Sequence, residues 1–473
     1  MARRQPKCTL KSGDNTTGTV FFRPVAVIEK AKHLKLTLPP PQITLYKDGL
    51  QSHDKLDRKP LADRLSKLLE SIDDPLVVAL DGGWGSGKSV FLQCWVGEHL
   101  REKSHTATTL YFDAFENDYL DDPLIALTGA LTDRLTPDSP ARGALKKLRL
   151  AAYKILPLAA RLGLAAATAG GTEAAGAIGG ALINQSAKDV EKAAEAYWKR
   201  EDGRRAAMQQ FRDALKALTE PDNDGTPQKK LVIVIDELDR CRPDYALQLL
   251  EVIKHFFATP GVHFVLGVNL HELANSVRAR YGAGIDAERY LHKFVQIRMP
   301  IQPRGYSGQV QSIYLKHFEY VCETLKIDAG TFSYFRDYLQ LLGPHAHPTL
   351  RDMERLGSLI ATTSMNLSEQ GDARDFLGGL MIIQVLRPSW IELARQSDMR
   401  YKFIAELFDW NGNSSSLQRA EYLRHRWQTY LDGVEALSAD ELSRYATNEW
   451  RNAKPEMVAR VIAQHLDAFA LPN

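Results

Sequence analysis

The sequence predicts an α/β fold in which helices flank a parallel sheet, with an all-α region after it. Four nearly all-apolar runs predict the strands, at residues 75–80, 108–112, 231–235 and 262–268. Each run ends next to a polar residue, as expected where strands stop at the edge of a sheet. Uninterrupted apolar runs are typical of parallel strands that helices cover on both faces. Ligands of such folds bind at the carboxyl ends of the strands.

The composition is that of an ordinary globular protein. Of the 473 residues, 44% are apolar and 25% are charged, and 60 Lys and Arg against 58 Asp and Glu leave a formal charge of +2. These values exclude disorder, collagen and coiled coil as descriptions of the whole chain. A charge so close to zero disfavours nucleic acid as a partner without excluding it.

The cysteines and the first residues favour a cytoplasmic protein. No two of Cys8, Cys94, Cys241 and Cys322 are close enough in sequence for a C-x-x-C pair or a zinc-ligand set, so we expect free thiols. The basic N-terminus leads into no apolar run, so no secretory signal is predicted. Association with the inner face of the cell membrane stays open.

The chain before the sheet is predicted in two parts. Residues 1–53 form a small β-rich segment, with extended pieces at 19–28 and 43–46 that are separated by three prolines. Apolar residues at helical spacing over 60–70, with Pro60 in the first turn, then predict an amphipathic helix. The sheet domain is expected over 54–303.

A helical insertion is expected at about residues 118–228, between the second and third strands. Its centre, residues 155–183, is rich in Ala and Gly and carries Arg161 and Glu173 as its charges. Two interpretations are open: small-residue helices packed against protein, or contact with a membrane. Residues 187–219 predict a highly charged helix, expected as a solvated arm.

The last part of the chain, residues 304–473, is predicted to be helical throughout. Apolar periodicity indicates helices at 309–325, 331–342, 373–407, 417–437 and 456–469.

Residues 82–89 carry the clearest chemical motif. They read Gly-Gly-Trp-Gly-Ser-Gly-Lys-Ser, which fits G-x-x-x-x-G-K-[ST] between a strand and a helix. The glycines allow backbone N–H groups to turn toward a phosphate, and the helix points its positive end there. We expect Lys88 to reach the β- and γ-phosphates and Ser89 to bind Mg²⁺. The predicted nucleotide-binding residues are Gly82, Gly83, Trp84, Gly85, Ser86, Gly87, Lys88, Ser89 and Val90.

An acidic pair follows the third strand. Asp236 is expected to hold the Mg²⁺ shell, mostly through water, and Glu237 to act as the general base that activates the attacking water. This adjacent pair favours hydrolysis over phosphoryl transfer to a small substrate.

Other polar residues complete the predicted catalytic set. Asn269, at the end of the fourth strand, is expected to polarise the water or touch the γ-phosphate, with a simple turn residue as the alternative. Arg240, Arg298 and Arg351 are candidates for stabilising transition-state charge, and the sequence does not choose among them. We place Arg351 in the set because it opens a helix, with a solvated salt bridge as the alternative. The loop that guanine recognition requires is missing after the glycine-rich turn, so ATP is the expected nucleotide.

Seven short motifs, in order along residues 54–395, resemble those of the KAP family of P-loop NTPases. Besides the glycine-rich loop, they are Asp57-Arg-Lys-Pro60, Phe112-Asp-Ala-Phe115, Ile235-Asp-Glu-Leu-Asp-Arg-Cys241, Tyr290-Leu-His-Lys-Phe-Val-Gln296, Leu350-Arg-Asp-Met-Glu-Arg355 and Leu386-Arg-Pro-Ser-Trp390.

The resemblance implies an ATPase of the additional-strand branch that works as an ATP-driven switch. Relatives often complete each other's sites across a subunit interface, which makes Lys293 and Arg298 candidates for a group donated in trans, with a packing or surface cation as the alternative for either. It also implies a homo-oligomer or a partner defence protein, in bacterial anti-phage defence or a membrane-associated signalling complex. Relatives often carry membrane-spanning helices where residues 155–183 fall, and many carry Asp where Asn269 stands.

Two alternatives to the switch remain open. One is a nucleotide-dependent oligomeric scaffold in which hydrolysis is marginal. The other, less favoured, is a motor ATPase that nucleic acid stimulates.

Overall fold

The computed structural model describes most of the chain. The described residues are 37–39, 41–120, 122–135, 142–155, 203, 205–301, 307–343, 345–363, 373–410, 417–445 and 454–467.

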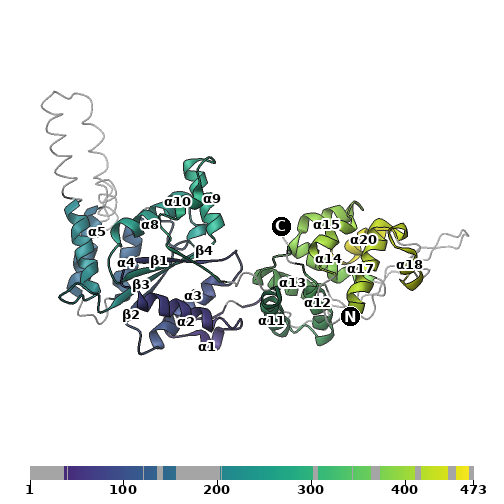
Figure 1. Cartoon of the computed structure of the whole chain (residues 1–473), viewed down its shortest axis with the longest axis horizontal. Helices are drawn as coiled ribbons and strands as arrows, with labels where there is room; N and C mark the ends of the chain where they lie inside the picture. The colour runs from purple at the N-terminus through teal and green to yellow at the C-terminus, as the bar shows by residue number, and fades with distance from the viewer. Residues whose placement is uncertain are drawn as a thin grey trace, which may run out of the picture.

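A five-stranded parallel sheet forms the first lobe (Figure 1). Its strands are β1 (Leu76–Asp81), β2 (Ala107–Asp113), β3 (Lys230–Asp236), β4 (Val262–Val268) and β5 (Ile297–Pro300). The spatial order is β2-β3-β4-β1-β5, and every neighbouring pair is parallel. The predicted parallel sheet is therefore confirmed. In addition, β4 lies between β1 and β3, so one strand separates the strand that leads into residues 82–89 from the strand that ends on Asp236.

The sequence did not predict β5. This strand has four residues, pairs only with β1, and alternates half-buried and exposed positions. A short edge strand of this kind has no apolar run to reveal it, because only one of its faces is buried.

Helices cover both faces of the sheet (Figure 1). On one side lie α1 (Leu50–His53), α2 (Lys59–Ser71) and α3 (Lys88–Arg101). Further helices of this lobe include α4 (Pro123–Leu135), α5 (Arg142–Ile155), α8 (Pro243–Phe256), α9 (Leu270–Tyr281) and α10 (Ala287–Leu291), with the 3₁₀ turn η2 (Leu238–Arg240) and a helix over residues 205–218. Strand residues alternate between the two cores. In β1, Val77 and Ala79 join one core, and Val78 and Leu80 join the other. Burial of both faces is the reason for the continuous apolar runs.

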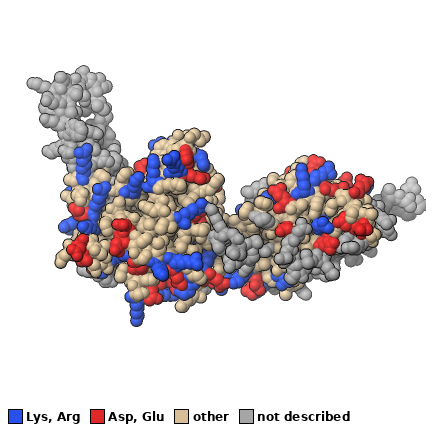
Figure 2. Space-filling model, in the orientation of Figure 1, with Lys and Arg blue, Asp and Glu red and all other residues tan. Residues whose placement is uncertain are grey.

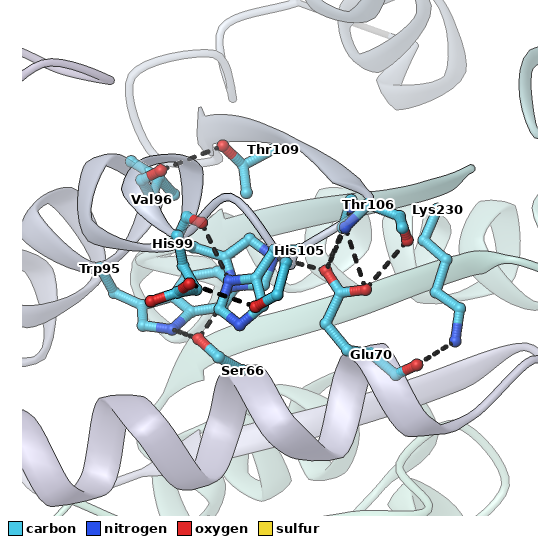
Figure 3. A network of polar contacts seen from close by, with 12 residues as sticks. Ser66, Glu70, Trp95, Val96, His99, His105, Thr106, Thr109 and Lys230 are labelled. Carbon is cyan, nitrogen blue, oxygen red and sulfur yellow. Dashed lines mark hydrogen bonds and ion pairs between the residues drawn. The ribbon is translucent and has the colours of Figure 1, made fainter. Parts of the chain in front are cut away.

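A polar network fastens α2 to α3 and to the start of β2 (Figure 3). The indole N–H of Trp95 donates to Ser66 Oγ at 3.1 Å, and Ser66 Oγ lies 2.9 Å from Nδ1 of His99. His99 Nε2 lies 3.1 Å from Glu70 Oε1, which also accepts the backbone N–H of Ala107 at 3.1 Å. Helix α2 is thus held at its C-terminal end by hydrogen bonds as well as by apolar packing.

Glu70, His99 and His105 bring possible metal ligands within 4.8 Å of one another. The two imidazole rings stack, however, with centroids 4.2 Å apart and planes 19° from parallel. Their in-plane nitrogen lone pairs therefore run side by side and do not converge on one ion. In addition, Nδ1 of His105 is bonded to the carbonyl oxygen of His99 at 3.0 Å. Structural hydrogen bonding accounts for this cluster.

The described part of the insertion packs against the sheet. Residues 205–218 are helical and bury Ala207, Phe211 and Leu215 in the main core. The expected solvated arm is wrong for this helix, because its apolar residues recur every four positions and cover the sheet. The remainder of the predicted arm, and residues 156–183 of the Ala/Gly stretch, lie outside the described residues. No helix among those described is both long and apolar enough to cross a membrane.

The expected β-rich start is wrong where it can be compared. Residues 43–46 form irregular chain and a turn, because the N–H of Thr44 donates to Asp48 Oδ2 at 2.7 Å and the N–H of Asp48 donates to the Thr44 carbonyl at 2.9 Å. Such local side-chain bonds compete with strand pairing. Residues 19–28 lie outside the described part of the chain.

The second lobe is helical and has its own core (Figure 1). Phe335, Leu377, Met381 and Trp427 are among its fully buried side chains. Its elements are α11 (Ser307–Leu325), α12 (Ala329–Gln340), α13 (Leu350–Thr362), α14 (Ala373–Leu386), α15 (Pro388–Arg395), α16 (Tyr401–Leu407), α17 (Leu417–Asp432), η3 (Val434–Ala436), α18 (Ala439–Tyr445) and α20 (Pro455–His465). The predicted C-terminal all-α region is confirmed over these residues.

Both signs of charge are spread over the surface of the two lobes. In the face that Figure 2 shows, Lys and Arg are interspersed with Asp and Glu on either lobe. This mixture agrees with the formal charge of +2.

Candidate nucleotide-binding site

The turn between β1 and α3 depends on glycine at two positions. Gly85 and Gly87 have φ of 76° and 78°, in the left-handed region that residues with a Cβ rarely occupy. A Cβ on Gly85 would lie 2.8 Å from the Cβ of Arg351, and one on Gly87 would lie 3.1 Å from Nη1 of Arg58. Conformation and close neighbours therefore both require glycine here.

Lys88 lies folded inside this turn. Its ammonium donates to the carbonyl oxygens of Gly82 at 2.6 Å and Gly83 at 3.2 Å. Burial lowers the pKa of Lys88, while Asp239 and Asp236 oppose this shift. The turn thus places the Lys88 ammonium where the oxygens of a bound phosphate would lie.

The two predicted magnesium ligands lie side by side. Asp236 is fully buried at the end of β3, and hydrogen bonds to its carboxylate come from the Ser89 and Tyr111 hydroxyls, the latter at 2.8 Å. The backbone N–H of Glu237 donates to the other carboxylate oxygen at 2.9 Å. Burial raises the pKa of Asp236, and these hydrogen bonds oppose the rise.

Glu237 sits in a constrained backbone conformation beside Asp236. Its φ of 59° is unusual for a residue other than glycine, and the residue lines the cavity. The carboxylate forms an ion pair of 2.7 Å with Nη1 of Arg240. Burial raises the pKa of Glu237, Arg240 lowers it, and Asp113 and Asp236 add to the rise.

Asn269 takes part in local structure at the end of β4. It is the N-cap of α9, and its Oδ1 accepts the backbone N–H of His271 at 3.2 Å. This contact is what the simpler alternative, a turn residue, requires. Its role toward water or phosphate stays a prediction.

The arginines and the lysine predicted as catalytic cations lie in different parts of the structure. Arg240 and Arg351 line the cavity beside the turn. Arg298 instead pairs with Asp81 at the end of β1, where its Nε lies 2.7 Å from Oδ2. Lys293 lies over the ring of Tyr290 at 5.0 Å. The structure therefore brings two of the three predicted arginines to the site.

One cavity joins these groups and reaches into the second lobe. Its volume is about 360 Å³. It is lined by Trp84–Val90, Asp236 and Glu237 from the first lobe, by His317, Tyr320, Leu350, Arg351 and Glu354 from the second, and by the apolar residues Leu38, Pro39, Pro41 and Leu50. The backbone N–H of Leu350 donates to the Gly85 carbonyl at 3.1 Å, so α13 begins directly against the turn.

Sequence reasoning missed three contacts at this site. Arg58, which also lines the cavity, donates to the carbonyl oxygens of Ser86 and Gly87, Tyr111 donates to Asp236, and the half-exposed Trp84 donates to Asp239 Oδ2 at 2.7 Å. Arg58 belongs to the motif Asp57-Arg-Lys-Pro60, which could have drawn attention to it. The motif alone assigns it no role.

Strand order, glycine-rich turn and acidic strand end together define a P-loop NTPase with an additional strand between β1 and β3. The sequence model of the KAP family P-loop domain matches residues 58–366. The chain therefore belongs to the KAP family of P-loop NTPases.

Comparison with solved structures found distant similarity to proteins named ORC. The chain is similar to a chain in "Structure of Drosophila ORC bound to DNA", with 14% identity, a TM-score of 0.38, and coverage of 82% of this chain and 84% of that one. It is also similar to the Aeropyrum pernix ORC2 protein in its ADPNP-ADP complexes, with 12% identity, a TM-score of 0.31, and coverage of 68% and 75%. A comparison with curated proteins found no match.

Proposed function

We propose that this chain is an ATP hydrolase that works as an ATP-driven switch. One observation carries the proposal: β1 and β3 bring Lys88, Ser89, Asp236 and Glu237 together around a single cavity. These are the side chains that nucleotide hydrolysis needs, namely a phosphate-binding cation, oxygen ligands for a metal and a base.

The residues at the strand ends fit Mg²⁺. A hydroxyl and a buried carboxylate in contact are oxygen ligands of the kind that this cation prefers. Ser89 and Asp236 would hold the ion, whose charge would neutralise the β- and γ-phosphate oxygens. The apolar end of the cavity, with Leu38, Pro39 and Leu50, supports adenine as the base, because a flat ring can be buried there.

Glu237 is suited to take a proton from water. Burial raises the pKa of its carboxyl toward the working pH, which is where a general base is most effective. Lys88 and Arg351 would stabilise charge that develops on the transferred phosphoryl group. Arg351 belongs to the second lobe, so this lobe would respond to the state of the nucleotide.

The biological setting is proposed from the family resemblance. We propose anti-phage defence or membrane-associated signalling in bacteria, with a homo-oligomer or a partner protein receiving the switch. The cavity is equally compatible with a nucleotide-dependent scaffold, so the experiment must separate binding from turnover.

Glu237→Gln tests the proposal. The variant should bind MgATP within about twofold of the wild type, because the amide keeps the shape of the side chain. Its turnover should fall by at least about 10²-fold, because the amide cannot accept the proton. Calorimetry and phosphate release measure the two effects, and Glu251→Gln on the exposed face of α8 is the control.

Turnover equal to the wild type in Glu237→Gln would exclude Glu237 as the base. A scaffold would give another pattern: assembly that depends on ATP, is lost in Lys88→Ala and persists in Glu237→Gln, with marginal turnover in the wild type.

A further inference from the structure

The carboxylate of Asp236 is held on both of its oxygens by groups of the protein. Its Oδ2 accepts the hydroxyl of Tyr111 at 2.8 Å, and its Oδ1 accepts the backbone N–H of Glu237 at 2.9 Å. The Ser89 hydroxyl also donates to this carboxylate. Next to Oδ1 there is no room for a side chain on Gly267, because a Cβ there would lie 2.4 Å from that oxygen. The protein's own groups therefore set the orientation of the carboxylate.

The register of the sheet brings Tyr111 to Asp236. Tyr111 of β2 pairs with Val234 of β3, and Asp236 follows two positions further along β3. Val234 and Tyr111 pack against the core on the α3 side, and residues two apart in a strand point to the same face. The backbone of Tyr111 is anchored as well, because its N–H donates to the Tyr46 hydroxyl at 3.0 Å. The Tyr111 hydroxyl thus reaches Asp236 from the neighbouring strand.

Helix α3 holds Tyr111 from its other side. Gln93 Nε2 lies 3.2 Å from the Tyr111 hydroxyl oxygen, and Gln93 stands four residues after Ser89, one turn along the same helix face. A phenol has one proton and an ionised carboxylate can only accept, so Tyr111 donates to Asp236 and accepts from Gln93. These contacts form a closed network that leaves α3 at Ser89, crosses β3 and β2, and returns to α3 one turn later.

The network is compatible with a metal on Ser89 and Asp236. A hydroxyl that donates its proton to a carboxylate keeps its oxygen lone pairs for another partner. An ionised carboxylate accepts about four hydrogen bonds, so three protein donors leave room for about one water of a magnesium shell. Without the Tyr111 hydroxyl, Oδ2 would lose its protein donor across the strands, and the carboxylate would be free to turn away from Ser89.

We propose that Tyr111 is a positioning residue for the magnesium ion of the nucleotide complex, and that Gln93 holds Tyr111 in place. Neither residue is among those that line the cavity, so both act through the Asp236 carboxylate. The inference rests on the proposed function, in which Ser89 and Asp236 hold the ion. It extends the site to β2 and to the second turn of α3.

The test measures the magnesium factor, which is the affinity for a non-hydrolysable ATP analogue in Mg²⁺ divided by the affinity in EDTA. In Tyr111→Phe this factor should fall by about tenfold, because loss of a group that orients a metal ligand weakens metal binding by about 10–100-fold. The affinity in EDTA should stay within about twofold of the wild type, because Lys88 and the glycine-rich turn are unchanged. Titration calorimetry on the full chain gives both affinities.

Tyr245→Phe is the matched control. Tyr245 of α8 is buried in the core beside the sheet, and its hydroxyl has no hydrogen-bond partner in the described part of the chain. Loss of that hydroxyl should leave the magnesium factor unchanged.

Gln93→Met tests the second half of the network. It should lower the magnesium factor by less than Tyr111→Phe does, because the phenol can still donate to Asp236. In the double variant it should add no further loss, because Gln93 acts through Tyr111. An unchanged factor in Gln93→Met, or a loss that adds in full to that of Tyr111→Phe, would overturn the role of Gln93.

Failure of this inference differs from failure of the proposed function. Lys88→Ala should lose nucleotide binding, and the wild type should bind the analogue more tightly in Mg²⁺ than in EDTA. If either result is missing, the proposed function fails and this inference fails with it.

Two results would overturn the role of Tyr111 alone, in a protein that meets both of those conditions. One is a wild-type magnesium factor in Tyr111→Phe. The other is a lower melting temperature with an unchanged factor in the folded fraction, which a purely structural hydrogen bond would give. Should Tyr111→Phe fail to fold, Gln93→Met, which keeps the tyrosine, supplies the comparison with Tyr245→Phe.

Discussion

At the scale of the residue, the acidic group at the end of β3 sets the chemistry. Asp236 is fully buried and accepts three hydrogen bonds, whereas Glu237 is half-buried, lines the cavity and forms one ion pair. Adjacent carboxyl groups thus have different environments, as a metal ligand and a base require.

Arg240→Gln should move the acid limb of the pH–rate profile to higher pH. Burial raises the pKa of Glu237 and Arg240 lowers it, so removal of Arg240 lets the pKa rise further. A base works when deprotonated, so turnover increases as pH rises through that pKa, and the increase should begin later in the variant. MgATP turnover as a function of pH measures the shift.

The control for this prediction is Arg242→Gln. Arg242 pairs with Asp118, outside the cavity, at 3.8 Å, so its loss should not shift the acid limb of the pH–rate profile. An unchanged limb in Arg240→Gln, or one at lower pH, would contradict the assignment of Glu237 as the titrating base.

The site residues that could be predicted are those that stand within, or directly after, a recognisable sequence pattern. Lys88 and Ser89 stand in a glycine-rich turn, and Asp236 follows an apolar run, so chain neighbours reveal them. Arg58 and Tyr111 were not predictable in the same way, because their partners Ser86 and Asp236 lie 28 and 125 residues further along. Only folding creates those contacts.

At the scale of the element, the turn before α3 combines conformational and steric demands. Gly87 is left-handed and close to Arg58 and Leu350, whereas a Cβ on Gly83 would meet nothing within 4 Å. Backbone conformation and neighbours in this structure therefore require glycine at position 87 but not at position 83.

Gly87→Ala should lower the free energy of unfolding by about 1–2 kcal/mol, because a Cβ opposes the left-handed conformation. Gly83→Ala should change it by less than about 0.5 kcal/mol in the absence of nucleotide. Urea unfolding of the nucleotide-free protein gives both values. Equal losses in the two variants would show that the backbone conformation at Gly87 does not limit stability.

Strands that are buried along their whole length were predicted most accurately from the sequence. Strands β1 and β4, buried throughout, match their predicted ranges within a residue. The edge strand β5 and the turn at 43–46 differ, because a half-exposed edge and local side-chain bonds leave no apolar periodicity to follow.

At the scale of the whole molecule, the second lobe meets the site through the N-terminus of α13. Thr349 and Asp352 form a capping box that fixes this end, and the N–H of Leu350 bonds the turn. Lys316 of α11 forms an ion pair with Asp57 nearby. Both lobes therefore contribute to one cavity.

Arg351→Ala should reduce turnover by about 10²-fold if its charge stabilises the transition state from the second lobe. Arg355→Ala, one turn along the exposed face of α13, should leave turnover near the wild type. Steady-state kinetics on folded variants measure both. Turnover at the wild-type rate in Arg351→Ala would exclude Arg351 as the group that stabilises the transition state.

The sequence by itself determined the α/β core, the glycine-rich turn and the acidic strand end, because these depend on burial and on neighbours along the chain. The tertiary structure decided what surrounds them. It placed β4 between β1 and β3, paired Arg298 with Asp81, and brought both Arg58 and Arg351 to the cavity beside the turn. Such placements join segments far apart in sequence, and the packing of those segments against one another determines them. No local pattern in the sequence predicts that packing.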